Sequence, residues 1–210
     1  MKTVIITVPL KDPDIVKPEH YPVDENKAIE YENPVRCPIN GVLAKTLKKD
    51  EEARVIYIMT KTTGENSHCE QNKKTFIEEL KVINSKIGAV LSYDTIEIDF
   101  KATKQTYNKL IMDLAEKIPE NSEIFSDITY GFKTEILSLF CAFRFVEEFR
   151  DALVQYIVYG KAEFIPKTDE MEHLMLYDIT SLYYLFKLMG SMGAGNAEDA
   201  MKTLKDFFAM

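Results

Sequence analysis

The chain has 210 residues and a net charge of −8, and 46% of its side chains are apolar while 29% are charged. This length and composition suit one α/β domain with an appendage and exclude a disordered chain. The negative charge argues against a long nucleic acid as partner, because such binding depends on neutralising phosphates. No apolar run is long enough for a membrane span and none resembles a signal peptide, so we expect a cytoplasmic protein without membrane contact.

The first third of the chain shows two strand patterns and one helix pattern. Residues 3–10 are a continuous apolar and β-branched run, typical of a strand buried on both faces, and residues 54–60 repeat this pattern. Between them lies a polar loop over residues 11–33, whose length indicates a functional or disordered segment. A helix is predicted over residues 38–47 from the spacing of its apolar residues.

The middle of the chain continues the alternation of strands and helices. The apolar spacing predicts a helix over residues 70–86 and another over residues 103–117, which ends before Pro119. Residues 89–100 between them predict a third strand, either continuous or bent into a pair.

The stretch over residues 123–159 has the clearest pattern of secondary structure in the chain. An alternating apolar run over residues 123–128 meets a polar turn over residues 129–133, and a long amphipathic run over residues 134–150 follows. A second strand-like run covers residues 153–159. This order of strand, turn, helix and strand is the pattern of a βαβ unit.

The turn of this unit is the predicted ligand site. It is expected at the carboxyl edge of a parallel sheet, where open α/β sheets bind their ligands. Gly131 permits a positive φ or a close approach of a ligand to the backbone. The amides that open the following helix, with Lys133 beside them, can hold an anion.

The tail of the chain is predicted to be helical. We interpret residues 160–169 as a linker and residues 174–189 as an apolar helix that ends at the glycine-rich segment 190–195. Asn196 is the predicted N-cap of a last helix over residues 197–208.

Strands that alternate with helices predict an α/β fold, namely a Rossmann-like, doubly wound and mostly parallel sheet with helices on both faces. We assign residues 1–165 to this domain and residues 166–210 to a small helical extension or connector. The chain stops at Met210, two residues after the pair Phe207 and Phe208. This ending favours a domain cut from a longer protein.

Several familiar motifs are missing from the sequence. There is no GxGxxG after the first strand, no GxxxxGK[ST] and no GxSxG. The cysteines and histidines lack metal-ligand spacing, so we expect no cofactor, no metal and reduced cysteines, with Cys141 in the core. His68 beside Cys69 and Asp12 near Asp14 are weak candidates for a nucleophile with a base and for a metal pair. We interpret His68 as a surface residue and the two aspartates as part of a solvated acidic loop.

The topology nevertheless predicts a cluster of polar and aromatic residues, because the loops after adjacent parallel strands converge at one edge of the sheet. The residues expected there are Pro9, Leu10, Lys11, Asp12, Thr60, Lys61, Thr62, Thr129, Tyr130, Gly131, Phe132 and Lys133. Lysines and amides suit phosphates, hydroxyls suit ribose or base edges, and aromatic rings suit base stacking. The cluster predicts a nucleotide-like ligand. In the alternative interpretation, Lys11 and Lys61 are only solvated and Phe132 fills the core.

The turn and its flanks also resemble a known family. The sequence DITYGFK at residues 127–133, followed by a helix and by VQYIVYGKA at residues 154–162, resembles the signature of the CRISPR-associated Rossmann-fold (CARF) sensors of type III systems. That signature runs roughly D-x-T-H-G-F-R, a helix, and a strand ending in Y-G. In this chain Tyr130 stands where the family commonly has His, and Lys133 where it commonly has Arg. The first loop lacks the small residues often found there.

The resemblance implies a homodimer that binds one cyclic oligoadenylate across its two-fold axis, at the carboxyl edges of both sheets. It also implies that binding switches on a fused effector domain, which would follow Met210. Some members cleave the ring without a metal, using a ribose 2′-hydroxyl as the nucleophile. In this chain Lys133 would then stabilise the developing charge and Thr129 would orient the ribose.

Three functions are compatible with these residues and with the resemblance. We favour a dimeric sensor domain for a cyclic oligoadenylate in type III CRISPR antiviral defence, with tetra-adenylate preferred over hexa-adenylate. The enzyme alternative is a metal-independent ring nuclease that ends the signal. The third alternative is an unrelated Rossmann-like nucleotide-binding protein, which predicts a pocket without phosphate-binding groups at the strand ends.

Overall fold

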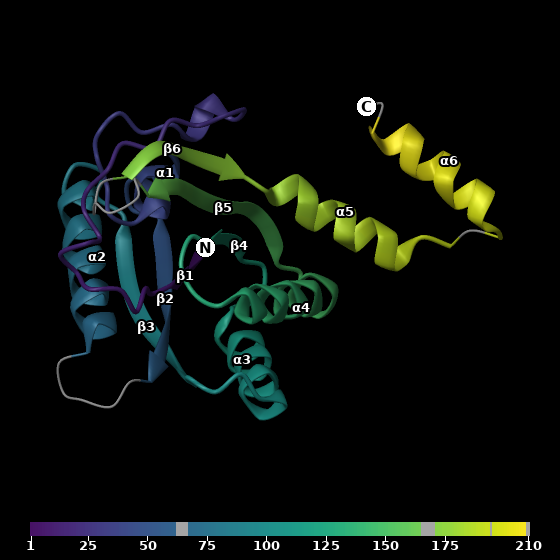
Figure 1. The fold of residues 1–210 in the computed structure, drawn as a ribbon, viewed down its shortest axis with the longest axis horizontal. Helices are drawn as coiled ribbons and strands as arrows, with labels where there is room; N and C mark the ends of the chain where they lie inside the picture. Colours follow the sequence, from purple (N-terminus) through teal and green to yellow (C-terminus); the bar gives the residue numbers. More distant parts are fainter. Residues whose placement is uncertain (62–66, 165–170, 194, 209–210) are drawn as a thin grey trace. The chain divides into compact units, whose positions relative to one another are not determined.

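The apolar runs of the sequence form the strands of one sheet (Figure 1). The structure is a computed structural model that describes residues 1–61, 67–164, 171–193 and 195–208. Within these residues six strands lie in the order β3-β2-β1-β4-β5-β6, and every neighbouring pair is parallel except β5 with β6, which is antiparallel. The strands are β1 (Lys2–Thr7), β2 (Glu52–Lys61), β3 (Val90–Asp99), β4 (Glu123–Asp127), β5 (Leu153–Phe164) and β6 (Met171–Asp178).

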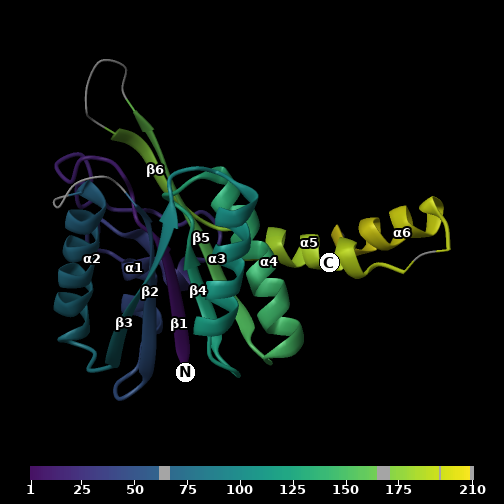
Figure 2. The same ribbon diagram turned by 90° about the horizontal axis from the view of Figure 1, so that it is seen from below.

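Helices cover both faces of this sheet. Figures 1 and 2 show α1 and α2 on one face and α3 and α4 on the other. These helices are α1 (Pro38–Thr46), α2 (His68–Asn84), α3 (Lys104–Lys117) and α4 (Lys133–Phe149), and a short 3-10 helix, η1 (Lys27–Ile29), lies in the loop after β1. The arrangement confirms the predicted Rossmann-like α/β fold with a mostly parallel sheet.

β1 is the centre of the sheet. All its residues are buried, and Val4 is paired with Val55 of β2 on one side and Phe125 of β4 on the other. A continuous β-branched sequence suits a strand that is covered on both faces. The strand order reverses between β1 and β4, and the crevice outside the carboxyl ends of the strands at this point is where such sheets bind ligands.

β6 occupies the beginning of the segment for which the sequence predicted a helix, residues 174–189, so that prediction is wrong as far as Asp178. The strand pairs with β5, placing Leu176 opposite Gly160, and the Leu176 amide donates to the Pro22 carbonyl at 2.8 Å. These partners are distant in sequence. Strand pairing of this kind overrides local helical spacing because burial and cross-strand packing decide it.

The boundary between β6 and the next helix is made by Asp178. Its Oδ1 accepts hydrogen bonds from the Thr180 amide at 3.1 Å and from the Thr180 hydroxyl at 2.5 Å. The Thr180 hydroxyl in turn accepts from the Ile157 amide at 2.8 Å. β5 also continues beyond its predicted end at Tyr159, so residues 160–164 of the predicted linker are strand. The rest of that linker lies outside the described residues.

The chain divides into two compact units, Met1–Thr180 and Ser181–Met210. α5 (Thr180–Ser191) and α6 (Ala197–Phe208) belong to the tail. Asn196 caps α6 as predicted, because its Oδ1 accepts from the Asp199 amide at 2.9 Å. Among the described helices, none has the length and apolar character that crossing a membrane requires.

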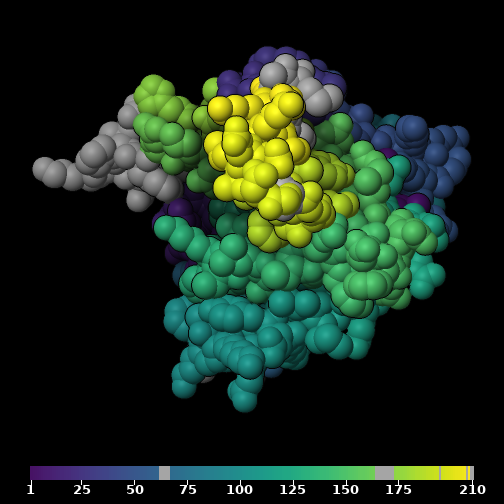
Figure 3. Space-filling view, turned by 90° about the vertical axis from the view of Figure 1, so that its right-hand side faces the viewer, coloured from purple at the N-terminus to yellow at the C-terminus, as the bar shows by residue number. Residues whose placement is uncertain are grey.

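The outer side of α4 is apolar. Leu137, Cys141, Phe145 and Phe149 recur at every fourth position and are exposed, Leu137 by 66% and Phe149 by 70%. Figure 3 shows the surface of this region, with α3 in teal and α4 in green. The expectation that Cys141 lies in the core is wrong, because the helix turns this residue to the solvent side, whereas the other two cysteines are buried.

Candidate functional site

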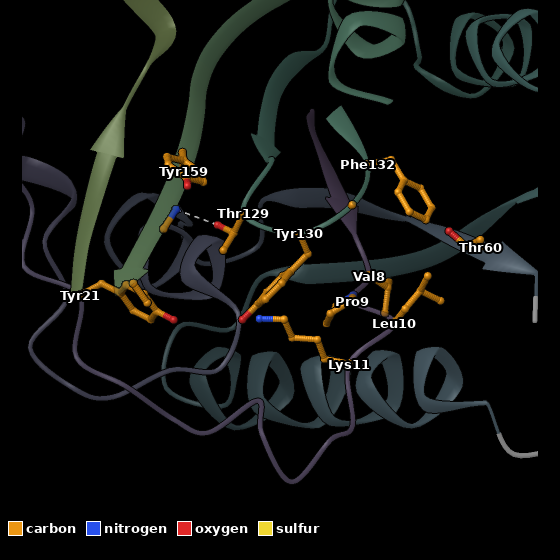
Figure 4. A pocket seen from close by; sticks show the side chains of 13 residues that line it. Val8, Pro9, Leu10, Lys11, Tyr21, Thr60, Thr129, Tyr130, Phe132 and Tyr159 are labelled. Atoms are coloured by element: carbon orange, nitrogen blue, oxygen red, sulfur yellow. Dashed lines mark hydrogen bonds between the residues drawn. The ribbon is translucent and has the colours of Figure 1, made fainter. Parts of the chain in front are cut away.

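A cavity of about 360 Å³ opens at the carboxyl ends of β1, β2 and β4 and beside β5 (Figure 4). It lies where the strand order reverses, which is the usual ligand position in open α/β sheets, and its volume is in the range of small-molecule sites. The residues that line it are Val8, Pro9, Leu10, Lys11, Tyr21, Thr60, Thr129, Tyr130, Gly131, Phe132, Tyr159, Gly160 and Ala162.

Most of the predicted site residues meet at this cavity. They are Pro9, Leu10, Lys11, Thr60, Thr129, Tyr130, Gly131 and Phe132. Asp12, Lys61 and Lys133 do not line it, and Thr62 lies outside the described residues. The loops after β1 and β4 therefore converge with the end of β2, but the predicted lysines do not all reach the same place.

The alternation of side chains along β2 separates Lys61 from the cavity. Successive residues of a strand point to opposite faces, and here Thr60 takes the cavity side. Lys61 Nζ lies instead 4.0 Å from Glu97 Oε2 and 3.9 Å from Asp99 Oδ1 of β3. Lys133, at the start of α4, is exposed and is not part of the wall.

Asp12 is held in a local turn outside the cavity. Its Oδ1 accepts from the Asp14 amide at 3.0 Å, and its Oδ2 lies 4.0 Å from His68 Nε2. Across the part of the chain that the structure describes, no three His, Cys, Asp or Glu residues are grouped so as to hold a metal ion. The geometry around Asp12 and Asp14 is that of an exposed turn.

Lys11 carries the only formal charge among the described residues of the cavity wall. Figure 4 shows its ammonium group pointing toward the hydroxyl of Tyr130. The loop that carries Lys11 is held by Asn72 of α2, whose amide Nδ2 donates to the Pro9 carbonyl at 3.1 Å and to the Lys11 carbonyl at 2.8 Å. Asn72 is fully buried. It was not predicted, because it stands in an otherwise ordinary amphipathic helix.

The turn after β4 has Gly131 at a positive φ, which is one of the two roles that the sequence suggested for this glycine. Its φ is +96°, and a Cβ at this position would lie 2.5 Å from Glu135 Oε2 and 3.0 Å from Thr7 Cβ. The turn is fastened to β1 by the Thr7 hydroxyl, which donates to the Tyr130 carbonyl at 2.6 Å. Gly131 thus supplies both a backbone conformation and a space that other residues would not.

Asp127, the last residue of β4, connects this turn to the N-terminus of α1. Its Oδ1 accepts from the Thr129 amide at 2.8 Å, and its Oδ2 accepts from the Ile39 amide at 3.0 Å. Burial raises the pKa of this carboxyl, and the hydrogen bonds oppose that rise. Because the α1 N-terminus already holds a protein carboxylate, it is not an open anion site.

The Thr129 hydroxyl is engaged by the protein itself. It accepts from the Gly160 amide at 2.8 Å and hydrogen-bonds to the Asp127 carboxylate. Gly160 is close-packed here, since a Cβ on it would lie 2.9 Å from Pro38 Cγ. Thr129 therefore joins the turn after β4 to β5. This contact explains why the βαβ unit has a threonine at residue 129 and a glycine at residue 160.

Aromatic side chains form much of the remaining wall. The Tyr130 hydroxyl donates to the Arg36 carbonyl at 3.2 Å, and burial raises the pKa of Tyr130 well above its ordinary value. Burial likewise raises the pKa of Tyr21, so both phenols stay neutral. Tyr21 comes from the long loop after β1 and Tyr159 from β5 (Figure 4). Neither was predicted, since a loop and the last positions of a strand carry no pattern that aims a side chain.

Glu135 occupies the N-terminus of α4. Its Oε2 accepts from the Phe132 amide at 3.2 Å, and the Glu135 amide donates to the Phe132 carbonyl at 2.9 Å. The side chain is only 4% exposed. Burial raises its pKa to about 7, and the hydrogen bond from Phe132 opposes the rise. The predicted anion position at the start of this helix therefore has a buried carboxyl directly behind it.

This arrangement suits a ligand with an aromatic part and an anionic part. The aromatic wall can stack on a planar ring, and Lys11 with the backbone of the turn can meet a phosphate. No protein-family model matches the sequence, and no curated protein matches it significantly. Any functional conclusion therefore depends on the chemistry of the cavity and on the fold.

Proposed function

We propose that this protein is a sensor that binds a cyclic oligoadenylate as a homodimer, with tetra-adenylate preferred over hexa-adenylate. The main observation in support of the proposal is the composition of the cavity at the point where the strand order reverses. There Lys11 shares the wall with aromatic side chains that include Tyr21 and Tyr159. A lysine next to stacking surfaces is the combination that nucleotides with a charged backbone require.

The size of the cavity supports a shared site. About 360 Å³ lies near the lower end of small-molecule sites, so one protomer has room for about one nucleotide unit and not for a ring of several. Two protomers related by a two-fold axis would present two equivalent cavities to one symmetric ring. The ring would then complete the site, which gives a physical reason for ligand-dependent signalling.

The apolar side of α4 supports pairing of two protomers. α4 begins at the cavity, since Phe132 lines it and the helix starts at the next residue. Leu137, Phe145 and Phe149 extend away from that point as an exposed apolar row. Exposed rows of this kind are typical of protein interfaces, and this one belongs to the helix that begins beside the cavity.

The hydrogen bonds of Thr129 and the position of Lys133 favour binding of the ring over its cleavage. The Thr129 hydroxyl is engaged with Asp127 and Gly160, and Lys133 does not line the cavity. A group that stabilises the charge developing during cleavage has to lie within hydrogen-bond reach of it. The roles that the family resemblance implies for Thr129 and Lys133 therefore find no support in their positions.

Calorimetric titration of the full chain with cyclic tetra-adenylate and cyclic hexa-adenylate tests the proposal, with linear tetra-adenylate as the control. We expect one ring bound per two chains at micromolar affinity or tighter, and an intact ring on chromatography afterwards. Linear products would identify the ring nuclease. Binding of a mononucleotide without binding of either ring would identify an unrelated nucleotide-binding protein.

Two matched lysine variants locate the site. Lys11→Ala removes the charge at the cavity and should weaken binding by roughly 1–3 kcal/mol, the range of a charge-assisted hydrogen bond. Lys61→Ala removes a lysine at the end of a neighbouring strand that faces β3 instead, and should leave affinity unchanged. Equal effects of the two variants would mean that only the general charge of this edge matters.

A further inference from the structure

Glu135 lies directly behind the cavity wall. Gly131 and Phe132 line the cavity, and Glu135 Oε2 accepts from the Phe132 amide at 3.2 Å. A Cβ on Gly131 would come within 2.5 Å of the same oxygen. The carboxyl can approach the turn this closely because Gly131 has no side chain.

The second oxygen of this carboxyl lacks the partners that the other buried carboxyl at this edge has. Glu135 Oε1 is buried and has no hydrogen-bond partner among the described residues. Asp127, another buried carboxyl at this edge, has hydrogen bonds to both oxygens. Burial without a replacement for water disfavours the ionised form and raises the pKa of Glu135 to about 7. The neutral and ionised forms therefore coexist near neutral pH.

The titratable groups around Glu135 do not compensate its charge. Burial raises the pKa of Cys69 in α2 to about 11, with a smaller contribution from Glu135, so the thiol is neutral. Asp99 at the end of β3 and Tyr107 of α3 line a small crevice with Glu135. Lys133, at the start of the same helix, is exposed and is not among the groups that shift the pKa of Glu135.

We infer that Glu135 couples the binding of an anionic ligand at the turn over residues 129–133 to the uptake of one proton. The inference rests on the proposed function, because it places a phosphate of the ligand at this turn. Glu135 touches no ligand atom in this role. It is a positioning residue that sets the charge behind the site.

The coupling follows from electrostatics at the start of α4. When Glu135 is ionised, its charge repels a phosphate across a buried layer, where water screens the interaction little. When Glu135 is neutral, the amides and the dipole of the helix N-terminus attract the phosphate without that opposition. A bound phosphate therefore stabilises the protonated carboxyl, and the solvent supplies the proton.

The size of the effect follows from linkage. The phosphodiester groups of a cyclic oligoadenylate stay singly ionised through the neutral range, so the ligand contributes no proton change of its own. Affinity should then follow the neutral fraction of Glu135. One ring meets two such turns, one in each protomer. For carboxyls that titrate near neutrality, each turn contributes about a tenfold rise between pH 6 and pH 8, so the dissociation constant of the ring should rise about a hundredfold.

The experiment is a calorimetric titration of the full chain with cyclic tetra-adenylate at pH 6, 7 and 8, in two buffers of different ionisation enthalpy. We expect this weakening of about a hundredfold and, at pH 8, the uptake of nearly one proton per occupied turn, which is nearly two protons per ring. Glu135→Gln keeps an acceptor for the Phe132 amide and fixes a neutral side chain, so its affinity should stay at the low-pH value throughout. Glu148→Gln, on the exposed side of the same helix, is the control and should keep the pH response.

Each result has a distinct meaning. A pH response that Glu135→Gln abolishes and Glu148→Gln preserves supports the inference. Binding that does not change with pH, or that responds equally in Glu135→Gln, overturns the inference and leaves the proposed sensor function standing. Absence of binding to either cyclic adenylate at every pH overturns the proposed function, and the inference with it.

Discussion

The N-termini of α1 and α4 are both capped by carboxylates, but only the one at α1 is completely closed. Asp127 Oδ2 accepts from the Ile39 amide at 3.0 Å. The two oxygens of Glu79 accept from the amides of Arg36 and Cys37, at 2.7 Å and 3.2 Å. The orphan amides that begin a helix are thus satisfied by two separate acidic side chains from β4 and α2.

At the start of α4 a single carboxyl, that of Glu135, accepts from a backbone amide, and only one of its oxygens does so. Glu135 Oε2 accepts from the Phe132 amide, and Oε1 has no partner among the described residues. The difference teaches that the amides at the start of α1 are held by carboxylates with partners on both oxygens. The carboxyl at the start of α4 has one oxygen without a partner among the described residues, and it lies beside the cavity. Each buried polar group without a partner in a native structure calls for an explanation, and a functional role is one such explanation.

The largest expected effect is the loss of the closed cap. Asp127→Ala removes the acceptor of two amides, Thr129 and Ile39, in the interior. Leaving buried donors unpaired should lower the free energy of unfolding by roughly 3–5 kcal/mol, measured by urea denaturation. Asp127→Asn keeps one acceptor and should lose clearly less. An equal loss in both variants would mean that the charge of Asp127, and not its hydrogen bonds, stabilises the edge.

The incomplete cap predicts a pH dependence of stability. The pKa of Glu135 is about 7 in the folded protein against an ordinary value of 4.5, so between these values the folded state binds more protons than the unfolded state. The free energy of unfolding should therefore fall as pH rises through this window. The contribution of Glu135 is about 3 kcal/mol, lost by pH 8.

Glu135→Gln isolates this contribution from the rest of the protein. Burial also raises the pKa of Asp127 and of Glu79, which adds changes of the same sign to the natural protein. The measured quantity is thus the difference between the two proteins in urea denaturation at pH 5, 6, 7 and 8. The variant should become the more stable of the two as pH rises. Parallel curves would show that Glu135 ionises as freely when folded as when unfolded.

Two glycines with positive φ sharpen the comparison further. Gly131→Ala would place a Cβ 2.5 Å from Glu135 Oε2, whereas Gly88→Ala, at a φ of +84°, would meet nothing closer than Lys49 Cγ at 3.5 Å. Both variants lose about 1 kcal/mol or more from backbone strain, and Gly131→Ala should lose about 2 kcal/mol beyond that. Urea denaturation measures both. If the two losses are equal, the close approach of Glu135 to the turn has no energetic consequence.

Local patterns predicted the elements around the site better than the side chains within it. The strand, turn and helix over residues 123–150 and the positive φ of Gly131 were predictable, because propensity and burial act within a few residues there. β6 was not, because its partner strand is what makes it a strand. Lys61 was assigned to the cavity although alternation along β2 sends it to the other face once Thr60 takes the cavity side.

Tyr21 and Glu135 show where prediction from sequence ends. Tyr21 reaches the cavity from a loop without periodicity, so only the folded path of the loop brings it there. Glu135 stands three residues after Phe132, and a capping pair is normally recognised by a Ser or Thr in the first position. Phenylalanine has no side-chain acceptor, so the pattern is not recognised from the sequence, although the Phe132 amide donates to Glu135 Oε2 as in such a pair.

The smallest expected effect concerns Asn72, which holds the loop that carries Lys11. Asn72→Ala removes its bonds to the Pro9 and Lys11 carbonyls, so the loop has to be ordered by the ligand itself. We expect cyclic tetra-adenylate to bind about 1 kcal/mol more weakly in calorimetry. Asn84 makes a comparable pair of bonds to the backbone of Ala89 at the other end of α2.

Asn84→Ala is therefore the matched control. It should lower the free energy of unfolding by about as much as Asn72→Ala, roughly 1–2 kcal/mol, without changing ligand affinity. The ratio of the two effects separates loop positioning from general loss of stability. Equal affinity in both variants would place the ligand away from the loop after β1, and would leave the turn after β4 as the part of the cavity that has to account for binding.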